Sequence, residues 1–267
     1  MHKKLGLVLG SGGTKGLAHI GVLQVLVREN IPIDMIAGSS MGALIAAAYA
    51  AGTDVEFMEK FASSITQSLI MDMNLPRMGL LKGDRALELI RLLTHKKDFS
   101  ELNIPLAVVA TDINKGEPVI FREGNLAQAV RASISIPGIF NPVRIKGRLL
   151  VDGAVTERLP VYALKEMGAD YIIGVDVKVC TEGSITTKAK IRSIYDVIMQ
   201  SIEILENKAC QTSLAMADCL ITPNTTAYSG TDFRMALECV AEGRIAAEQK
   251  LDTIKQEWAR ISVAVAN

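Results

Sequence analysis

The sequence predicts an α/β fold built on a mostly parallel sheet. Short apolar segments rich in Val, Ile and Leu alternate along the chain with longer segments of helical periodicity, and most of the short segments are apolar at every position. A strand of that kind is covered on both faces, as in a parallel sheet with helices on either side. The composition agrees, because a chain of 267 residues that is 49% hydrophobic and 22% charged is globular rather than disordered.

The elements follow in order along the chain. The expected strands are Leu5–Leu9, Ile33–Ala37, Pro105–Thr111, Tyr171–Val177 and Cys219–Thr222. The expected helices are Leu17–Arg28, Met41–Ala51, Val55–Leu69, Arg85–Thr94, Leu126–Ser133 and Val161–Met167. Two longer helical patterns, Lys188–Ala217 and Asp232–Trp258, flank the last strand and are expected to pack on the sheet or cover its edge.

No repeat, low-complexity tract or long linker divides the chain, so one domain is expected. Residues 5–165 carry the motifs described below and form the predicted catalytic core. Residues 166–267 are expected to supply strands and long helices that complete the same domain.

The charge balance argues against a nucleic-acid partner. The 29 Lys and Arg residues equal the 29 Asp and Glu residues, and aromatic residues make up only 4% of the chain, so neither phosphate attraction nor base stacking is favoured.

The apolar run Ala43–Ala51 is too short to span a bilayer, and the apolar segment after Lys4 is too short for a signal-peptide core. We therefore expect a cytoplasmic protein that can transiently reach the inner membrane surface.

Cysteine and histidine are too sparse to suggest a metal or disulfide framework. The cysteines Cys180, Cys210, Cys219 and Cys239 contain no paired CxxC, and are expected to be reduced and buried. The only histidines are His2, His19 and His95. No metal and no cofactor are expected.

A glycine-rich loop, Gly10-Ser11-Gly12-Gly13-Thr14-Lys15-Gly16, follows the first strand and precedes a helix. Lys15 stands where a dinucleotide-binding GxGxxG frame needs glycine, and Gly16 stands where a phosphate-binding Walker loop needs Ser or Thr. The loop is therefore either an anion site with free N–H donors or a structural turn.

A second motif, Gly38-Ser39-Ser40-Met41-Gly42, matches GxSxG between an expected strand and an expected helix. A nucleophile elbow needs this context, because small flanking residues permit the sharp turn that exposes the serine oxygen. Ser40 is thus the candidate nucleophile, and the N–H of Met41 is a candidate oxyanion donor.

The base that would activate Ser40 is less obvious. In the order known from α/β-hydrolases a histidine follows the acid, but here all three histidines precede residue 96. Asp152 ends the apolar segment Leu149–Val151 and is followed by Gly153 and Ala154. Asp152 is therefore a candidate base, and the alternative is that it belongs to an ordinary Asp-Gly turn. Asp112 and Asp176 also end strands. A histidine upstream in the sequence is a further alternative for the base.

These blocks together resemble the bacterial patatin-like phospholipases. The blocks Gly12–Gly16, Gly38–Gly42 and Asp152–Ala154 stand in the family's order and spacing, and Arg131–Pro137 resembles a fourth block between elbow and aspartate. The resemblance covers roughly residues 5–165, and the region of Asp232 and Phe233 resembles the tail of the smaller bacterial members. Ser11 and Ala154 replace glycines that the family often carries.

The resemblance implies a three-layer α/β/α fold and a Ser40–Asp152 dyad. It implies that the N–H groups of Gly12 and Gly13 form the oxyanion hole. The supporting motif residues are Gly10, Thr14, Lys15, Gly16, Gly38, Gly42, Gly153 and Ala154. A free aspartate has a pKa of about 3.9, so the site must desolvate Asp152 or couple it tightly to Ser40.

The expected function is hydrolysis of carboxylic esters in phospholipids, lysophospholipids or simpler acyl esters. An acyltransferase using the same acyl-enzyme is the alternative; related acyl-carrier transacylases have histidine where Ser39 stands, which favours hydrolysis. A non-catalytic lipid-binding module is a third possible function.

The irregular segment Ser63–Gly83 is either core filling or an apolar rim for membrane contact. Its apolar residues are Met71, Met73, Leu75, Met78, Leu80 and Leu81.

Overall fold

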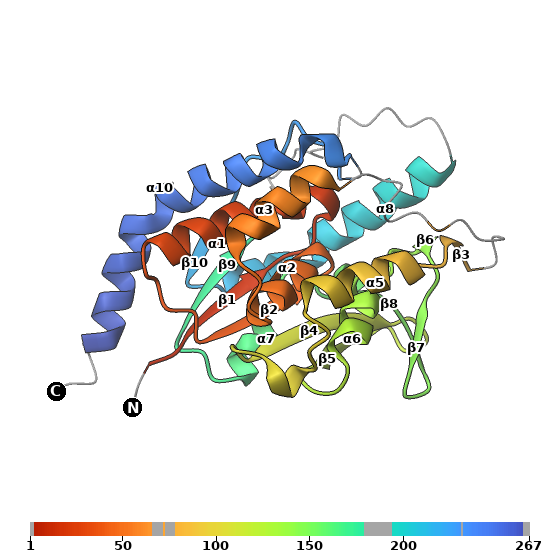
Figure 1. Ribbon diagram of the computed structural model, residues 1–267, viewed down its shortest axis with the longest axis horizontal. Helices are drawn as coiled ribbons and strands as arrows, with labels where there is room; N and C mark the ends of the chain where they lie inside the picture. The colour runs from red at the N-terminus through yellow and green to blue at the C-terminus, as the bar shows by residue number, and fades with distance from the viewer. Residues whose placement is uncertain (1–2, 66–71, 73–77, 179–193, 231, 264–267) are drawn as a thin grey trace.

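A central sheet runs through the molecule, and both halves of the chain contribute strands to it (Figure 1). The computed structural model describes residues 3–65, 72, 78–178, 194–230 and 232–263. The parallel part of the sheet has the order β10-β9-β1-β2-β4. Its strands are β1 (Leu5–Leu9), β2 (Met35–Ser39), β4 (Leu106–Asp112), β9 (Tyr171–Val175) and β10 (Cys219–Ile221).

Antiparallel strands extend the sheet beyond β4. Strand β8 (Arg148–Asp152) pairs with β4 in a register that sets Asp152 opposite Ala110, and β7 (Val143–Ile145) pairs with β8. Strand β5 (Glu117–Phe121) also pairs with β4. Strands β5 and β7 were not predicted from the sequence; both are short, and most of their residues are exposed or only partly buried. A separate two-stranded sheet joins β3 (Gly79–Leu81) to β6 (Gly138–Phe140).

Helices cover both faces of the sheet, which confirms the three-layer prediction. Leu5, Leu7 and Leu9 point to one face, while Val8 packs on the other, as the two-residue period of a strand requires. The first face is covered by α1 (Ala18–Arg28), α2 (Met41–Ala50), α3 (Val55–Ser64), α5 (Asp84–Leu93), α6 (Leu126–Ser133) and α10 (Ala236–Val263). The second face is covered by α7 (Val161–Glu166) and the region of α9 (Gln211–Ala215).

Helix α1 lies inside the molecule, because α10 packs along it on the side away from the sheet (Figure 1). Its residues from Ala18 to Leu26 are buried. Helix α8 (Ile194–Ala209) lies at one end of the molecule, where it contacts the short helix η3 (Gly153–Val155). Other single turns are η1 (Gly13–Leu17), η2 (Phe99–Glu101) and η4 (Phe233–Met235).

Most expected elements are present, with shifted ends. The strand expected over Ile33–Ala37 runs from Met35 to Ser39, and the helix expected over Val55–Leu69 ends at Ser64, after which Ile65 is extended. The pattern over Lys188–Ala217 contains α8 and α9, separated at Cys210. Met71, Met73 and Leu75 lie outside the described residues.

The described cysteines, Cys210, Cys219 and Cys239, are buried thiols that take part in no disulfide among the described residues. Cys180 lies outside the described residues. Within the part of the chain that the structure describes, no helix combines the length and apolarity needed to cross a bilayer.

Candidate active site

Ser40 sits in a sharp turn between β2 and α2. It is the N-cap of α2 and has φ 54° and ψ −124°, a backbone conformation that a residue with a side chain rarely adopts. The turn is possible because residue 42 is a glycine that lies against the end of the neighbouring strand β1: a Cβ on Gly42 would stand 2.1 Å from the carbonyl oxygen of Leu9. The GxSxG pattern thus forms the strand–turn–helix geometry of a nucleophile elbow.

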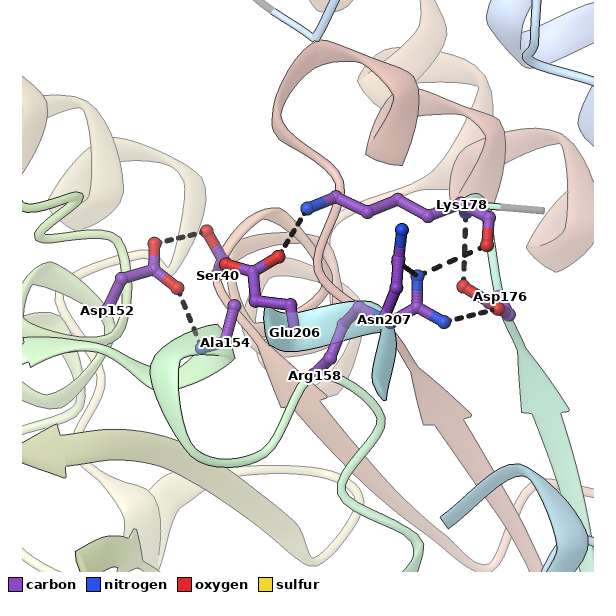
Figure 2. Close-up of polar contacts among 8 residues, drawn as sticks. All are labelled: Ser40, Asp152, Ala154, Arg158, Asp176, Lys178, Glu206 and Asn207. Carbon is purple, nitrogen blue, oxygen red and sulfur yellow. Dashed lines mark hydrogen bonds and ion pairs between the residues drawn. The ribbon is translucent and has the colours of Figure 1, made fainter. Parts of the chain in front are cut away.

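Two strand pairings bring Asp152 beside Ser40. Strand β4 pairs with β2 so that Val109 stands opposite Ser39, and it pairs with β8 so that Ala110 stands opposite Asp152. The two candidate residues therefore meet at one edge of the sheet, although 112 positions separate them in sequence. The Ser40 hydroxyl donates a hydrogen bond of 2.6 Å to Oδ2 of Asp152 (Figure 2).

The second carboxylate oxygen of Asp152 is also held. The backbone N–H of Ala154, in the turn that follows, donates to Oδ1 at 2.9 Å. Asp152 is only 3% exposed, and its burial raises its pKa to about 7, against the opposing effect of the hydrogen bonds from Ser40 and Ala154. Desolvation thus makes this carboxylate a far stronger base than a free aspartate.

The other strand-end aspartates have different partners. Asp112 accepts a hydrogen bond from the N–H of Asn114 in its own turn. Asp176 forms a buried ion pair with Arg158, with Oδ2 2.8 Å from Nη2. Of the three aspartates considered from the sequence, Asp152 is the one bonded to Ser40.

His19 lies behind the glycine-rich loop rather than at Ser40. Its Nε2 is 2.7 Å from the carbonyl oxygen of Gly10, so a proton on Nε2 would be donated to that carbonyl. Complete burial lowers the pKa of His19 to about 4, and the ring is neutral at pH 7. His95 lies near Thr53, at the far end of α5. His2 lies outside the described residues.

The glycine-rich loop is fixed on both sides of Gly12 and Gly13. The N–H groups of Ser11 and Thr14 donate to the carbonyls of Arg158 and Gly230, whereas no described residue accepts from the N–H of Gly12 or Gly13. Gly13 has φ 56°, and a Cβ there would stand 2.2 Å from the Gly230 carbonyl oxygen. The loop therefore offers two N–H groups beside the start of α2, where the N–H of Met41 also lacks an intrahelical acceptor.

Lys15, within this loop, is buried at 4% exposure, and that burial lowers the pKa of its ammonium group. Gly10, Gly16, Gly38 and Gly153 complete the supporting motif, and each has backbone or side-chain atoms where a Cβ would stand.

One supporting residue was missed by the sequence analysis, although it belongs to the noted block Arg131–Pro137. Ser133 accepts a hydrogen bond of 2.9 Å from the backbone N–H of Ser40 and donates one of 2.6 Å to the carbonyl of Val109. It therefore fixes the elbow to β4. Only a role for the block as a whole could be read from the sequence.

Arg131 in the same block organises the neighbouring segment. Its buried guanidinium donates to the backbone carbonyls of Lys82, Gly83 and Asn141, and it lies over the ring of Phe140. These contacts join α6 to the small β3–β6 sheet and to the start of α5.

A cavity of about 250 Å³ opens beside Ser40. It follows α2 from Ser40 past Leu44 to Ala48, a rise of roughly 12 Å. Its lining is almost entirely aliphatic and aromatic. Further lining residues come from η1, α1, α3, α5 and the β3–β6 region, and include Leu17, Ile20, Met58, Phe61, Leu81, Ile90, Leu93 and Phe140. Such a cavity suits a hydrocarbon chain. Among the described residues no group of His, Cys, Asp or Glu is arranged to hold a metal ion.

The fold and the elbow define the class of the protein: an α/β protein with a serine at a nucleophile elbow and an aspartate bonded to it. The family model of patatin-like phospholipases matches residues 7–165, and the chain belongs to this family.

Similar sequences and a similar solved structure agree with this family assignment. An uncharacterized NTE family protein of Mycobacterium tuberculosis is 40% identical over 177 residues, which are 65% of this chain and 49% of that protein. The chain thus spans about half the length of this mycobacterial relative. Lysophospholipase nte1 of Aspergillus fumigatus is 33% identical over 66% of this chain and 12% of its own length. The crystal structure of VipD from Legionella pneumophila matches 94% of this chain and 67% of that chain with a TM-score of 0.67 and 16% identity, a likeness of fold.

Proposed function

We propose that the protein hydrolyses carboxylic esters of lipids through an acyl-enzyme on Ser40, with Asp152 as the base. The observation that carries this proposal is the 2.6 Å hydrogen bond to a buried carboxylate from Ser40, a residue that also lines an apolar cavity. Family membership supports the same reaction class. A phospholipid, a lysophospholipid or a simpler acyl ester fits this description.

In the first step the Ser40 oxygen attacks the ester carbonyl while Asp152 accepts the hydroxyl proton. The negative charge that develops on the carbonyl oxygen is stabilised by the N–H groups of Gly12, Gly13 and Met41. A single donor of this kind lowers the barrier by about 3–4 kcal/mol. The alcohol portion then leaves with the proton from Asp152, and the acyl group remains on Ser40.

In the second step a water molecule attacks the acyl-enzyme and gives its proton to Asp152. The tetrahedral species collapses, the fatty acid leaves, and the Ser40 oxygen regains the proton. Asp152 thus works as base and then as acid in each half of the cycle, which a carboxyl group with a pKa near 7 can do at neutral pH.

The cavity along α2 is the proposed acyl-chain site. Leu44 and Ala48 follow Ser40 by one and two helical turns, so a chain bonded to Ser40 would extend along that face of the helix. The lining offers apolar contact and few polar partners, which favours an alkyl chain over a polar substituent.

The segment next to the cavity supplies a proposed lipid contact. Leu80 is 49% exposed, while Leu81 beside it is 5% exposed and lines the cavity. Phe57 on α3 is also exposed and stacks on Phe61, which lines the cavity. Exposed apolar side chains next to an apolar cavity suit contact with a lipid surface, and zero net charge leaves apolar contact as the main attraction.

This contact is tested with Leu80→Ser. The rate on a long-chain lipid in vesicles should fall about tenfold relative to the rate on a soluble butyrate ester, because the two substrates share the chemistry but not the interface. Leu81→Ser is the comparison: it alters the cavity and should slow vesicle and soluble long-chain substrates alike. If Leu80→Ser slowed both assays equally, the lipid contact would be rejected.

The nucleophile is tested by labelling with a fluorophosphonate and mapping the labelled peptide. Ser40 should carry the label, and Ser40→Ala should remove it. Ser39→Ala is a matched control, because Ser39 is also buried but its hydroxyl has no hydrogen-bond partner among the described residues. Asp152→Asn should keep the fold and reduce kcat at least about a thousandfold. A label on another serine of an active preparation would overturn the assignment.

The alternative acyltransferase activity is distinguished from hydrolysis by the molecule that accepts the acyl group from Ser40. The same acyl-enzyme would yield free fatty acid with water and a new ester with an added alcohol such as glycerol. Hydrolysis predicts that fatty acid stays the main product when glycerol is present at moderate concentration. A non-catalytic binding module would show neither product and no label at Ser40.

A further inference from the structure

A largely buried pair of charged side chains lies near the candidate dyad. The ammonium group of Lys178, just after β9, lies 2.5 Å from Oε2 of Glu206 on α8, and the two side chains are 17% and 9% exposed. Figure 2 shows the Glu206 carboxylate in the neighbourhood of Ser40, with Lys178 reaching it from β9. Neither residue lines the acyl cavity.

A second buried pair holds this arrangement in place. Arg158 forms an ion pair with Asp176, and both side chains are at most 2% exposed. The same guanidinium donates to the backbone carbonyl of Lys178 and to the side-chain oxygen of Asn207, each at 3.1 Å. Asp176 also accepts from the backbone N–H of Lys178. Arg158 therefore fixes the position of Lys178 and, through Asn207, that of α8 at the residue next to Glu206.

The pair lies close enough to Asp152 to act on its charge. Helix α8 contacts η3, which begins directly after Asp152. The groups that act on the Asp152 carboxyl are the Ser40 hydroxyl from α2, the Ala154 N–H from η3, Glu206 from α8 and Lys178 after β9. Glu206 raises the pKa of Asp152 and Lys178 lowers it, while burial has the largest effect.

We propose that Glu206 is a positioning residue of this site, which Lys178 holds beside Asp152 so that its negative charge helps Asp152 to take the proton from Ser40. The proposal rests on the hydrolytic function proposed above. A nearby carboxylate disfavours the charged form of Asp152 and favours its neutral form, which is the form reached when the Ser40 proton has been transferred. The Lys178 ammonium fixes the Glu206 carboxylate and limits the repulsion, so that Asp152 can still lose its proton near neutral pH.

The inference is tested by the pH dependence of kcat/KM on a soluble ester. In Glu206→Gln the rise of activity with pH should move to lower pH, by about half a unit or more for charges separated by several Å, and the plateau should fall a few-fold because the base is weaker. In Lys178→Met the rise should move to higher pH. The double variant should lie between the two, because the opposing charges are removed together.

Lys208→Met is the control for Lys178→Met, since Lys208 is exposed on the same helix as Glu206 and is not one of the groups that act on Asp152. Its pH profile should superimpose on that of the wild type. A merely structural role for the ion pair would lower activity in both single variants without moving the profile in opposite directions. Shifts of the same sign, or profiles that coincide with the wild type, would overturn the inference.

A second measurement separates this inference from the proposed function. The free energy of unfolding is measured as a function of pH for two pairs of proteins. The first pair is the wild type and Asp152→Asn; the second pair is Glu206→Gln and the double variant Glu206→Gln/Asp152→Asn. Within each pair, the difference in unfolding free energy changes with pH as Asp152 ionises, and this measurement needs no substrate turnover. Its midpoint should be lower in the Glu206→Gln background. If the protein hydrolysed no ester, this midpoint would still support or reject the electrostatic role of Glu206.

Discussion

The side chain of Ser133 bonds to the backbone of Ser40 at the turn that places the candidate nucleophile. Its hydroxyl oxygen accepts the Ser40 N–H at 2.9 Å and donates to the carbonyl of Val109 on β4. Ser133 is fully buried, so no solvent can replace these bonds without a rearrangement. The strained conformation of Ser40 is thus tied to the neighbouring strand by a residue from α6.

Ser133→Ala should therefore destabilise the protein and loosen the elbow. Loss of the hydroxyl leaves the buried N–H of Ser40 and carbonyl of Val109 without that partner, which costs about 1–3 kcal/mol of unfolding free energy. We expect kcat to fall about tenfold. Ser135→Ala is the control, because Ser135 is equally buried but, among the described residues, its hydroxyl bonds to Arg131 and not to the elbow. Equal losses of kcat in the two variants would show that the Ser133 bond has no special role.

Asp152→Asn should stabilise the protein above neutral pH. Burial raises the pKa of Asp152 from an ordinary value near 3.8 to about 7, so the folded state binds this proton more tightly than the unfolded state. That contribution to stability is complete below about pH 4 and is lost as pH rises through about 7, a change of a few kcal/mol. Since Asn does not ionise, the variant's advantage in unfolding free energy should grow between pH 4 and 8. Urea unfolding across this range measures it, and a difference independent of pH would contradict the raised pKa.

The wild-type kcat/KM should rise with pH through a single ionisation near pH 7. This is close to the ordinary pKa of histidine, so the pH profile alone does not distinguish a histidine base from Asp152. The histidine substitutions make the distinction. Because His19 is buried, neutral and bonded to Gly10, its change to Gln with His2 and His95 should leave the profile in place and kcat within about tenfold. If a His19 variant folded and bound substrate but its kcat/KM no longer rose with pH, the dyad mechanism would be excluded.

Ala48→Phe should change the acyl-chain preference. Ala48 is 1% exposed and lines the cavity two helical turns from Ser40, so a phenyl ring there would occupy the space of a long chain. The ratio of kcat/KM for a palmitoyl ester to that for a butyryl ester should fall at least about tenfold, or about 1.4 kcal/mol. The butyryl ester serves as the internal control for folding and chemistry. An unchanged ratio in a stable variant would place the acyl chain elsewhere.

Much of the fold could be predicted because its signals are local. Continuous apolar runs such as Leu5–Leu9 and the segment ending at Asp112 are buried on both faces, and they appear as β1 and β4. The elbow at Ser40 was predictable for a similar reason, since small residues on both sides of a serine between strand and helix permit the sharp turn that a nucleophile elbow needs. Strand β5 could not be predicted in this way, because only one of its residues is fully buried and its pairing with β4 makes this short segment a strand.

What the sequence by itself determined is the set of chemical groups and their local geometry: a serine in an elbow, a glycine loop with N–H donors, and an aspartate at a strand end. The tertiary structure decided which groups meet and what their charges do. The pairing of β4 with both β2 and β8 selects Asp152, rather than Asp112 or Asp176, as the partner of Ser40. The raised pKa of Asp152 and the neighbouring Glu206–Lys178 pair depend on burial and on contacts between distant segments, because desolvation and Coulomb interactions act through space and leave no pattern in the order of residues.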